Sequence, residues 1–153
     1  MTDQQTQQPT FSIEKIYVKD LSLEIPNAPK VFLEREQPEI DMQLHTDSQQ
    51  LDEGVFEATL RVVVTAKLGE KVLFLVEARQ AGIFQIRNVP ASDIDAILGS
   101  ACPNILFPYV RETISDVVNR AGFPPVLLAP INFDALFQKQ QLAQQQPPST
   151  ETH

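Results

Sequence analysis

A largely apolar stretch that contains five prolines, residues 102–137, limits the possible folds more than any other part of the chain. Asn104 lies near its start and can cap the free N–H groups of a first helical turn, so we expect a helix from this point. The helix is predicted to end at Gly122, because the two prolines that follow shortly after cannot continue it. Its first turns carry apolar side chains on nearly all sides of the axis, at Ile105, Leu106, Phe107, Tyr109 and Val110. One small sheet covers only one side of such a helix, so a second subunit is the natural cover for the rest.

The length and charge of the chain limit the classes of function. With 153 residues the chain suits one domain, which at this size buries about 68–70% of its unfolded surface. The net charge is −8, from 12 basic and 20 acidic residues, and the sequence shows no basic cluster. This balance argues against nucleic acid and against anionic membrane surfaces, both of which attract Lys and Arg. It suits a basic protein partner, although charge of this size also serves simple solubility.

Both ends of the chain are predicted to be disordered tails around one domain. Residues 1–10 and 143–153 are polar and rich in Gln, Thr and Pro, which leaves residues 11–142 as the expected domain. The first segment has no positive region and no apolar run, so we expect no secretory signal. The longest uncharged run, 96–110, contains two prolines and is too short to span a membrane. The single cysteine, Cys102, cannot form an internal disulfide, which favours the cytoplasm.

Alternating apolar and polar residues predict antiparallel strands before the long helix. The expected strands cover residues 11–25, 39–47, 55–68 and 71–86. The phase of the first strand slips near Ile16–Val18, which indicates a bulge or a bend, and Gly82 indicates a bulge in the last. Residues 47–54 are expected to form a polar turn, and Gly69 begins a short hairpin turn.

Two shorter helices are expected on either side of the long one. The first covers residues 93–98 and is predicted to end at Gly99, while the last begins after Asn132 as its cap. The predicted fold is therefore α+β, with a four-stranded antiparallel sheet followed by a long helix and a short C-terminal helix.

The sequence offers few groups for catalysis. Cys102 and His45 are the only possible thiol–imidazole pair, and no supporting motif surrounds them, so a cysteine that merely packs is the simpler interpretation. Two histidines cannot build a metal site at any usual spacing, and the five separate glycines form no phosphate-binding loop. Scattered carboxylates are typical of solvated strand faces. We predict no enzyme, no catalytic residue, no metal and no cofactor.

Apolar side chains also occur in irregular, proline-rich segments. Val31–Leu33 follows a crossover with two prolines, and Phe123–Leu128 follows the long helix. Such segments are able to bound a groove, and apolar grooves bind apolar ligands or extended peptides. The alternative is that both segments simply fold over their own domain.

Several short blocks carry more specific information than these patterns. They are Tyr17–Asp20, Pro26–Pro29, Gln37–Glu39, Gly82–Phe84, Cys102–Tyr109 with Arg111–Glu112, and Leu128–Leu136. In this order and spacing, from about Phe11 to Phe137, the chain closely resembles the SecB family of export chaperones.

The resemblance implies a homotetramer, built as a dimer of dimers, in which sheets join edge to edge and the long helices pack between the dimers. It implies ATP-independent binding of unfolded precursor proteins, which are kept translocation-competent and delivered to the SecA translocation ATPase. Neither nucleic acid nor direct membrane insertion is expected.

The resemblance also implies three sets of functional positions. SecA docking corresponds to residues on the outer sheet face, namely Asp20, Glu24, Leu75 and Glu77. The client groove corresponds to apolar positions, namely Phe11, Tyr17, Phe32, Ile40, Met42, Leu44 and Phe137. The oligomer interface corresponds to the long helix, namely Ile105, Leu106, Tyr109, Val110, Ile114 and Val117.

Two positions depart from the family pattern, and three other functions stay open. Glu36 stands where the family usually has a tryptophan, and Val76 stands where some members have a cysteine. The main alternative is a non-catalytic oligomeric adaptor that recruits a basic partner without holding clients. The others are a Cys102-dependent enzyme and a toxin–antitoxin-linked chaperone of the same fold.

Overall fold

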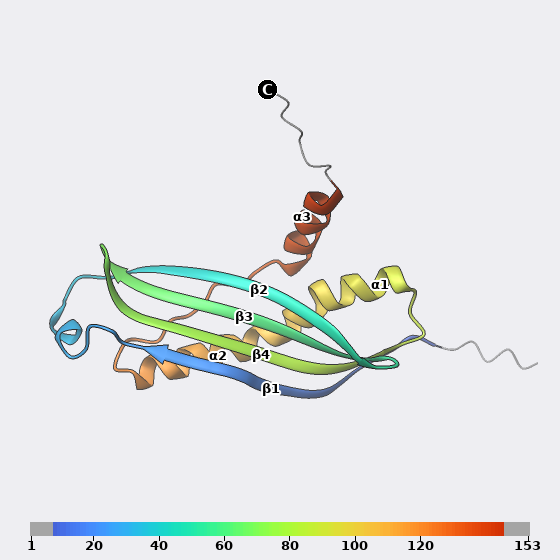
Figure 1. Ribbon diagram of the computed structural model, residues 1–153, viewed down its shortest axis with the longest axis horizontal. Coiled ribbons are helices and arrows are strands. Elements are labelled where there is room, and N and C mark those ends of the chain that lie inside the picture. The colour runs from blue at the N-terminus through green and yellow to red at the C-terminus, as the bar shows by residue number, and fades with distance from the viewer. Residues whose placement is uncertain (1–7, 146–153) are drawn as a thin grey trace, which may run out of the picture.

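A single antiparallel sheet with one long helix on one face forms the body of the protein (Figure 1). The computed structural model describes residues 8–145. The strands, in the sheet order β1-β4-β3-β2, are β1 (Thr10–Glu24), β2 (Glu39–Asp52), β3 (Val55–Leu68) and β4 (Lys71–Arg87). The helical elements are η1 (Lys30–Leu33), α1 (Ala91–Ala96), the π-helical turn η2 (Ile97–Ala101), α2 (Cys102–Arg120) and α3 (Phe133–Gln145). The predicted α+β architecture is confirmed.

The core lies between α2 and the middle strands of the sheet. Every fourth residue of α2 faces the sheet, so one stripe is fully buried, formed by Leu106, Val110, Ile114 and Val118. Alternate residues of β3 meet this stripe, among them Leu60, Val62 and Val64. Each such side chain contributes about 1.5–3 kcal/mol by leaving water.

This packing corrects part of the expected oligomer interface. Leu106, Val110 and Ile114 have no accessible surface in the single chain, because they are already covered by the sheet. They are core residues, and their assignment to a subunit interface was wrong. Tyr109 is 46% exposed, and Ile105 and Val117 are partly exposed, so these three retain surface for a partner.

The short helix expected over residues 93–98 does not end at Gly99. α1, η2 and α2 form one continuous helical stretch, and Ala101, which precedes α2, is itself helical. Asn104 therefore lies inside the helix and caps nothing. Gly99 serves instead as a contact point, because a Cβ there would lie 2.4 Å from a ring carbon of Phe137 in α3.

The C-terminal end of α2 and the start of α3 agree with the sequence prediction. Gly122 has a positive φ of 93°, and its N–H donates to the carbonyl of Asn119 while that of Phe123 donates to Val118. These two bonds form a Schellman cap, which a glycine favours. Asn132 caps α3 through its side-chain oxygen, which accepts from the N–H of Ala135 at 3.0 Å.

Two bulges in β1 keep its apolar side chains on the α2 side of the sheet. The β1–β4 register shifts between Ile13 and Lys15 and again between Val18 and Asp20, which brackets the predicted slip. The predicted bulge at Gly82 is absent from β4, where Gly82 lies in regular register. A Cβ at this glycine would contact Phe84 and, at 3.2 Å, Leu106, so its role is close packing with the helix.

Three boundaries also differ from the expectation. β2 continues to Asp52, so only the residues next to Gly54, where φ is 68°, form the turn before β3. Thr10 belongs to β1 and α3 extends to Gln145, past the expected domain end at residue 142. The remaining parts of the two predicted tails lie mostly outside the described residues.

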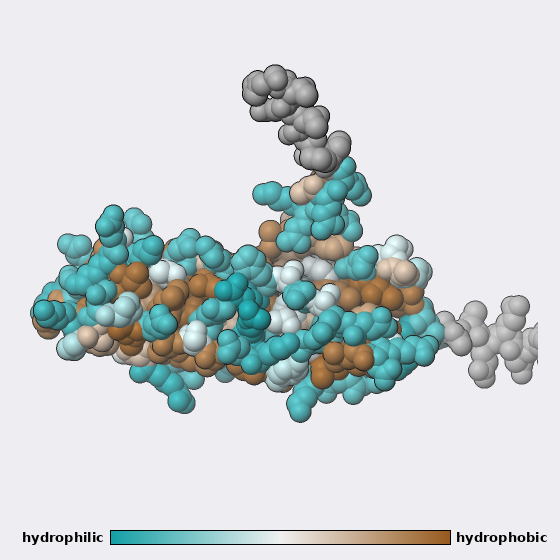
Figure 2. Space-filling model, in the orientation of Figure 1, coloured by the Kyte–Doolittle hydropathy of each residue, from teal (hydrophilic) through white to brown (hydrophobic). Residues whose placement is uncertain are grey.

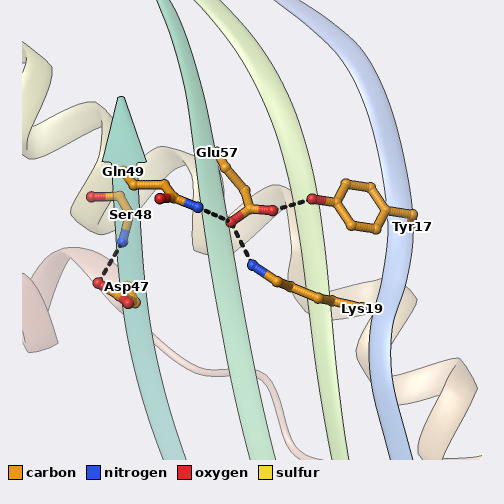
Figure 3. A network of polar contacts seen from close by, with 6 residues as sticks. All are labelled: Tyr17, Lys19, Asp47, Ser48, Gln49 and Glu57. Carbon is orange, nitrogen blue, oxygen red and sulfur yellow. Dashed lines mark hydrogen bonds and ion pairs between the residues drawn. The ribbon is translucent and has the colours of Figure 1, made fainter. Parts of the chain in front are cut away.

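A buried carboxylate ties three strands together on the outer face, which is the sheet face turned away from α2 (Figure 3). Glu57 in β3 is only 6% exposed and accepts hydrogen bonds from Tyr17, from Lys19 at 2.8 Å and from Gln49 at 3.0 Å. Burial acts to raise the pKa of Glu57, but these donors outweigh it and lower the pKa below its usual value. Burial, followed by the bond to Glu57, raises the pKa of Tyr17 to about 12.

We expect Gly99→Ala to loosen α3. The added methyl group would overlap the Phe137 ring, so overpacking is expected to cost roughly 1–3 kcal/mol. Hydrogen exchange of the α3 amides should become faster than in the wild type. In a Phe137→Ala background the same change should have little further effect; unchanged α3 protection in Gly99→Ala alone would contradict this role.

We expect Glu57→Gln to lower stability at neutral pH by about 1–3 kcal/mol, because Tyr17 and Lys19 lose a charged acceptor. A lowered carboxyl pKa stabilises the fold above the ordinary value of 4.5 and ceases to do so as pH falls through the folded-state pKa. The difference between the variants should therefore shrink below about pH 4.5. Urea unfolding at a fixed protein concentration measures it, with Glu53→Gln at an exposed turn as the control; a difference that is constant with pH would refute the assignment.

Candidate functional site

The residues expected to dock SecA lie together on the outer face. Glu24 in β1 lies opposite Leu75 in β4. Among the β1–β4 pairs whose side chains point to this face, Glu77 belongs to the next pair along and Asp20 to the one after that. We call these four residues the acidic corner. Figure 2 shows apolar and polar side chains beside each other on the outer face. The apolar ones gather toward the crossover segment, residues 25–38, which joins β1 to β2. The corner thus combines two exposed carboxylates with a half-buried leucine.

Glu77 differs from the other carboxylates of the acidic corner. Its Oε1 accepts a hydrogen bond from Nε of Arg61 at 2.5 Å, and this bond holds the pKa of Glu77 below its usual value. The charge of Glu77 is therefore partly compensated within the chain. Asp20 and Glu24 are exposed, and among residues 8–145 neither has a basic nitrogen within 4.0 Å.

An apolar groove with a volume of about 770 Å³ lies on the α2 side of the sheet. Its walls are the crossover segment and the segment after α2, and its floor includes part of β2 and β4. The residues that shape it are Val31, Phe32, Ile40, Met42, Phe74, Phe123 and Leu127. Both proline-rich segments therefore border one groove instead of closing over the domain.

The walls of the groove are fixed to the sheet by specific contacts. Val31 is buried, and the Asn27 side chain donates to the carbonyl of Val72 at 2.8 Å. The ring of Phe123 lies between two others, with centroids 5.2 Å from Phe32 and 4.9 Å from Phe74. Such aromatic contacts add to burial and hold both segments against β4.

An exposed leucine in the groove indicates surface that is not used by the fold. Leu127 lines the groove and is 82% exposed, although its neighbours are well anchored. Leu33 follows the lining residue Phe32 and is 81% exposed, but it does not itself line the groove. The sequence indicates the segment 123–128 as a border of a groove, but its pattern distinguishes no residue within the segment. Its apolar composition in an irregular stretch was the only available signal for Leu127.

The seven predicted client positions do not form one surface. Phe32, Ile40 and Met42 line the groove. The others lie elsewhere: Phe11 stacks on Phe84, Tyr17 bonds Glu57 on the outer face, Leu44 packs on the core, and Phe137 lies against Gly99.

A second apolar surface lies beside α2. The side chains of β1 that point to the helix side stay partly open, because α2 covers mainly β3 and β4. The exposed members of this row are Phe11, Ile13, Val18, Leu21 and Leu23. These residues belong to the edge strand β1, and together with Tyr109 on α2 they form an uncovered apolar area.

The thiol–imidazole pair considered in the sequence does not form. Cys102 is buried on the helix side of the sheet, whereas His45 is exposed and lies opposite Arg61 on the outer face. Burial raises the pKa of the Cys102 thiol to about 12, which keeps it protonated at neutral pH. Among residues 8–145, no group of three or more His, Cys, Asp or Glu side chains is placed to hold a metal ion.

No helix within the described part of the chain is long and apolar enough to cross a membrane.

Comparison with known proteins gives a consistent result. The family model of the preprotein translocase subunit SecB matches residues 4–145. The protein-export protein SecB of Chromobacterium violaceum is 72% identical over 144 residues, covering 94% of this chain and 96% of the relative. The protein of the same name from Neisseria meningitidis is 59% identical over 138 residues, covering 90% of this chain and 94% of the relative.

A solved structure supports the fold independently. A SecB-like chaperone from Mycobacterium tuberculosis, solved in complex with a peptide from an antitoxin, superposes with a TM-score of 0.67. It covers 79% of this chain and 90% of its own, at 16% sequence identity. The family match, these relatives and the shared fold lead to one conclusion: the chain belongs to the SecB family of protein-export chaperones.

Proposed function

We propose that this chaperone holds unfolded precursor proteins in the apolar groove, without ATP, and delivers them to the SecA translocation ATPase in the cytoplasm. The observation that carries the client-binding part is the groove itself, whose anchored walls leave Leu127 exposed. Apolar grooves of this kind recognise extended or amphipathic segments that folded proteins do not display. No catalytic residue takes part.

Hydrophobic burial is sufficient for such a holdase. Burying roughly 200 Å² of client and groove surface would contribute about 5 kcal/mol before the costs of ordering the client. Apolar contacts with the groove walls are not directional, so client segments of many sequences fit. Affinity of this size is compatible with release to a competing receptor.

We propose that the uncovered apolar area of β1 and α2 is closed by further copies of the chain. β1 is an edge strand of 15 residues whose helix-side surface is open, and long open edges are normally paired or covered. Tyr109, Ile105 and Val117 supply apolar contacts on α2. A homotetramer arranged as a dimer of dimers covers both surfaces, in agreement with the family.

We propose that the acidic corner docks a basic segment of SecA. Asp20 and Glu24 supply exposed negative charge and Leu75 supplies an apolar contact beside them. Such an arrangement steers encounter and permits dissociation. The adaptor alternative uses the same corner but leaves the groove without a client, so a client-holding assay separates the two.

The test of the proposed function is a holdase assay. A slow-folding, Trp-containing precursor is diluted from denaturant into the protein without ATP, and the mixture is analysed by size exclusion with light scattering. Because the chain contains no tryptophan, fluorescence reports the client alone. Co-elution of fluorescence with a tetramer supports the holdase; a tetramer that leaves the client aggregated favours the adaptor.

Leu127→Ser should weaken client holding while leaving the fold intact. Its side chain is exposed at the groove, so the change removes apolar client contact without opening the core. The dissociation constant for a precursor is expected to rise about fivefold. The matched control is Leu142→Ser on α3, which is 63% exposed and does not line the groove. Equal effects of the two variants would remove the groove from the mechanism.

The double variant Asp20→Ala with Glu24→Ala should weaken SecA binding about tenfold in calorimetric titration, most strongly at low salt. Client holding should be unchanged, because the corner lies on the opposite sheet face from the groove. Glu77 is left in place, since its removal would also strand Arg61. Glu53→Ala with Asp95→Ala is the control for total charge, both residues being exposed elsewhere. SecA affinity equal to that control would contradict the docking assignment.

A further inference from the structure

Two arginines on the outer face stand opposite each other and share one carboxylate. Arg61 in β3 and Arg79 in β4 are direct partners in the strand register. Nε of Arg61 lies 2.5 Å from Oε1 of Glu77, while Nε of Arg79 is 4.0 Å from the same oxygen. Like charges directly opposite on neighbouring strands repel each other. One carboxylate therefore serves two guanidinium groups, and Arg61 has the closer contact.

Arg79 has a longer and weaker contact with the Glu77 carboxylate than Arg61 has. Among residues 8–145, Glu77 is the only carboxylate within 4.0 Å of its guanidinium nitrogens. Asp20 is its register partner on β1 but does not approach within this distance. The Arg79 side chain is 46% exposed, so its donors are open to a ligand from outside.

A hollow of about 320 Å³ lies next to this pair on the outer face. Its wall includes both arginines, the hydroxyl-bearing Thr59, and Lys19, whose Nζ is paired with the lining residue Glu57 at 2.8 Å. Asp47 also lines the hollow, so both signs of charge meet there. The sequence shows no basic cluster, because these basic residues come from three different strands. The sheet brings them together within an otherwise acidic protein.

We propose that Arg79, supported by Arg61, is an anion-accepting subsite that takes a carboxylate side chain from the protein segment docking on the outer face. This inference rests on the proposed docking role of the acidic corner, which borders the subsite. The planar fork of an arginine matches a carboxylate with two parallel hydrogen bonds.

The surroundings favour a side-chain carboxylate over a free anion. Glu77 lies 4.0 Å from Arg79, and Asp20 is its partner on β1, so a freely diffusing, multiply charged anion is repelled. A carboxylate side chain carries a single charge, and basic residues of its own segment already hold it in place. It therefore tolerates this repulsion. The partner segment therefore carries basic residues for Asp20 and Glu24 and an acidic residue for Arg79, and a purely basic segment binds less well.

The experiment compares Arg79→Gln with Lys67→Gln in the full-length protein, using purified SecA as the probe in calorimetric titration. Both variants remove one positive charge, and Lys67 is exposed with no carboxylate within 4.0 Å among residues 8–145. Long-range attraction alone predicts equal or slightly tighter binding for both, because the protein becomes more acidic. The subsite predicts that Arg79→Gln binds about threefold more weakly, whereas Lys67→Gln does not.

A second measurement identifies the partner group. Each acidic residue of the docking segment of SecA is replaced by its amide and titrated against wild type and Arg79→Gln. One of these changes is expected to weaken binding to the wild type but not to Arg79→Gln, because its contact is already lost. Additive effects for all of them would overturn the proposal. The Arg61–Glu77 pair is intact in Arg79→Gln, and an unchanged thermal unfolding midpoint confirms the fold.

The double variant Asp20→Ala with Glu24→Ala separates the two possible failures. If it weakens SecA binding while Arg79→Gln binds as tightly as the wild type, the docking face is correct and the subsite is wrong. If it leaves SecA binding unchanged, the docking face is wrong, and the subsite that borders it is rejected with it.

Discussion

The packing of α2 against the sheet is the interaction on which the rest of the structure depends. A stripe of residues four apart, from Leu106 to Val118, meets the alternating side chains of β3 and β4 in a buried apolar core. Gly82 permits a close approach, since a side chain there would press on Leu106. The sheet thereby has one face on which the helix packs and one free face.

A single helix is too narrow to cover four strands, and the open surfaces follow from this geometry. On one side of α2 the apolar row of β1 stays uncovered, which suits further copies of the chain. On the other side, near the end of the helix, the crossover segment and the segment after Gly122 border the groove beside β2. The groove and the uncovered β1 row are thus two consequences of the same incomplete cover of the sheet.

The free face of the sheet carries charge instead of apolar cover. Its side chains are held by contacts between strands, such as the Glu57 network and the pairing of Arg61 with Glu77 (Figure 3). Carboxylates and guanidinium groups alternate there within a few ångströms, so the face presents both signs of charge. A partner that docks on it is selected by the arrangement of its charges as well as by their sum.

The sequence predicted the order of the strands and helices, the orientation of most strand side chains and the family, because periodicity, capping residues and conspicuous blocks are local properties. It predicted the ends at Gly122 and Asn132 and the face shared by Leu75 and Glu77. No local pattern shows that Gly99 contacts Phe137, that Leu106 belongs to the core or that Arg79 stands opposite Arg61. These contacts depend on how the helices and strands are placed in the fold. The reason is physical: periodicity tells which way a side chain points, but cross-strand register and helix placement decide what it meets.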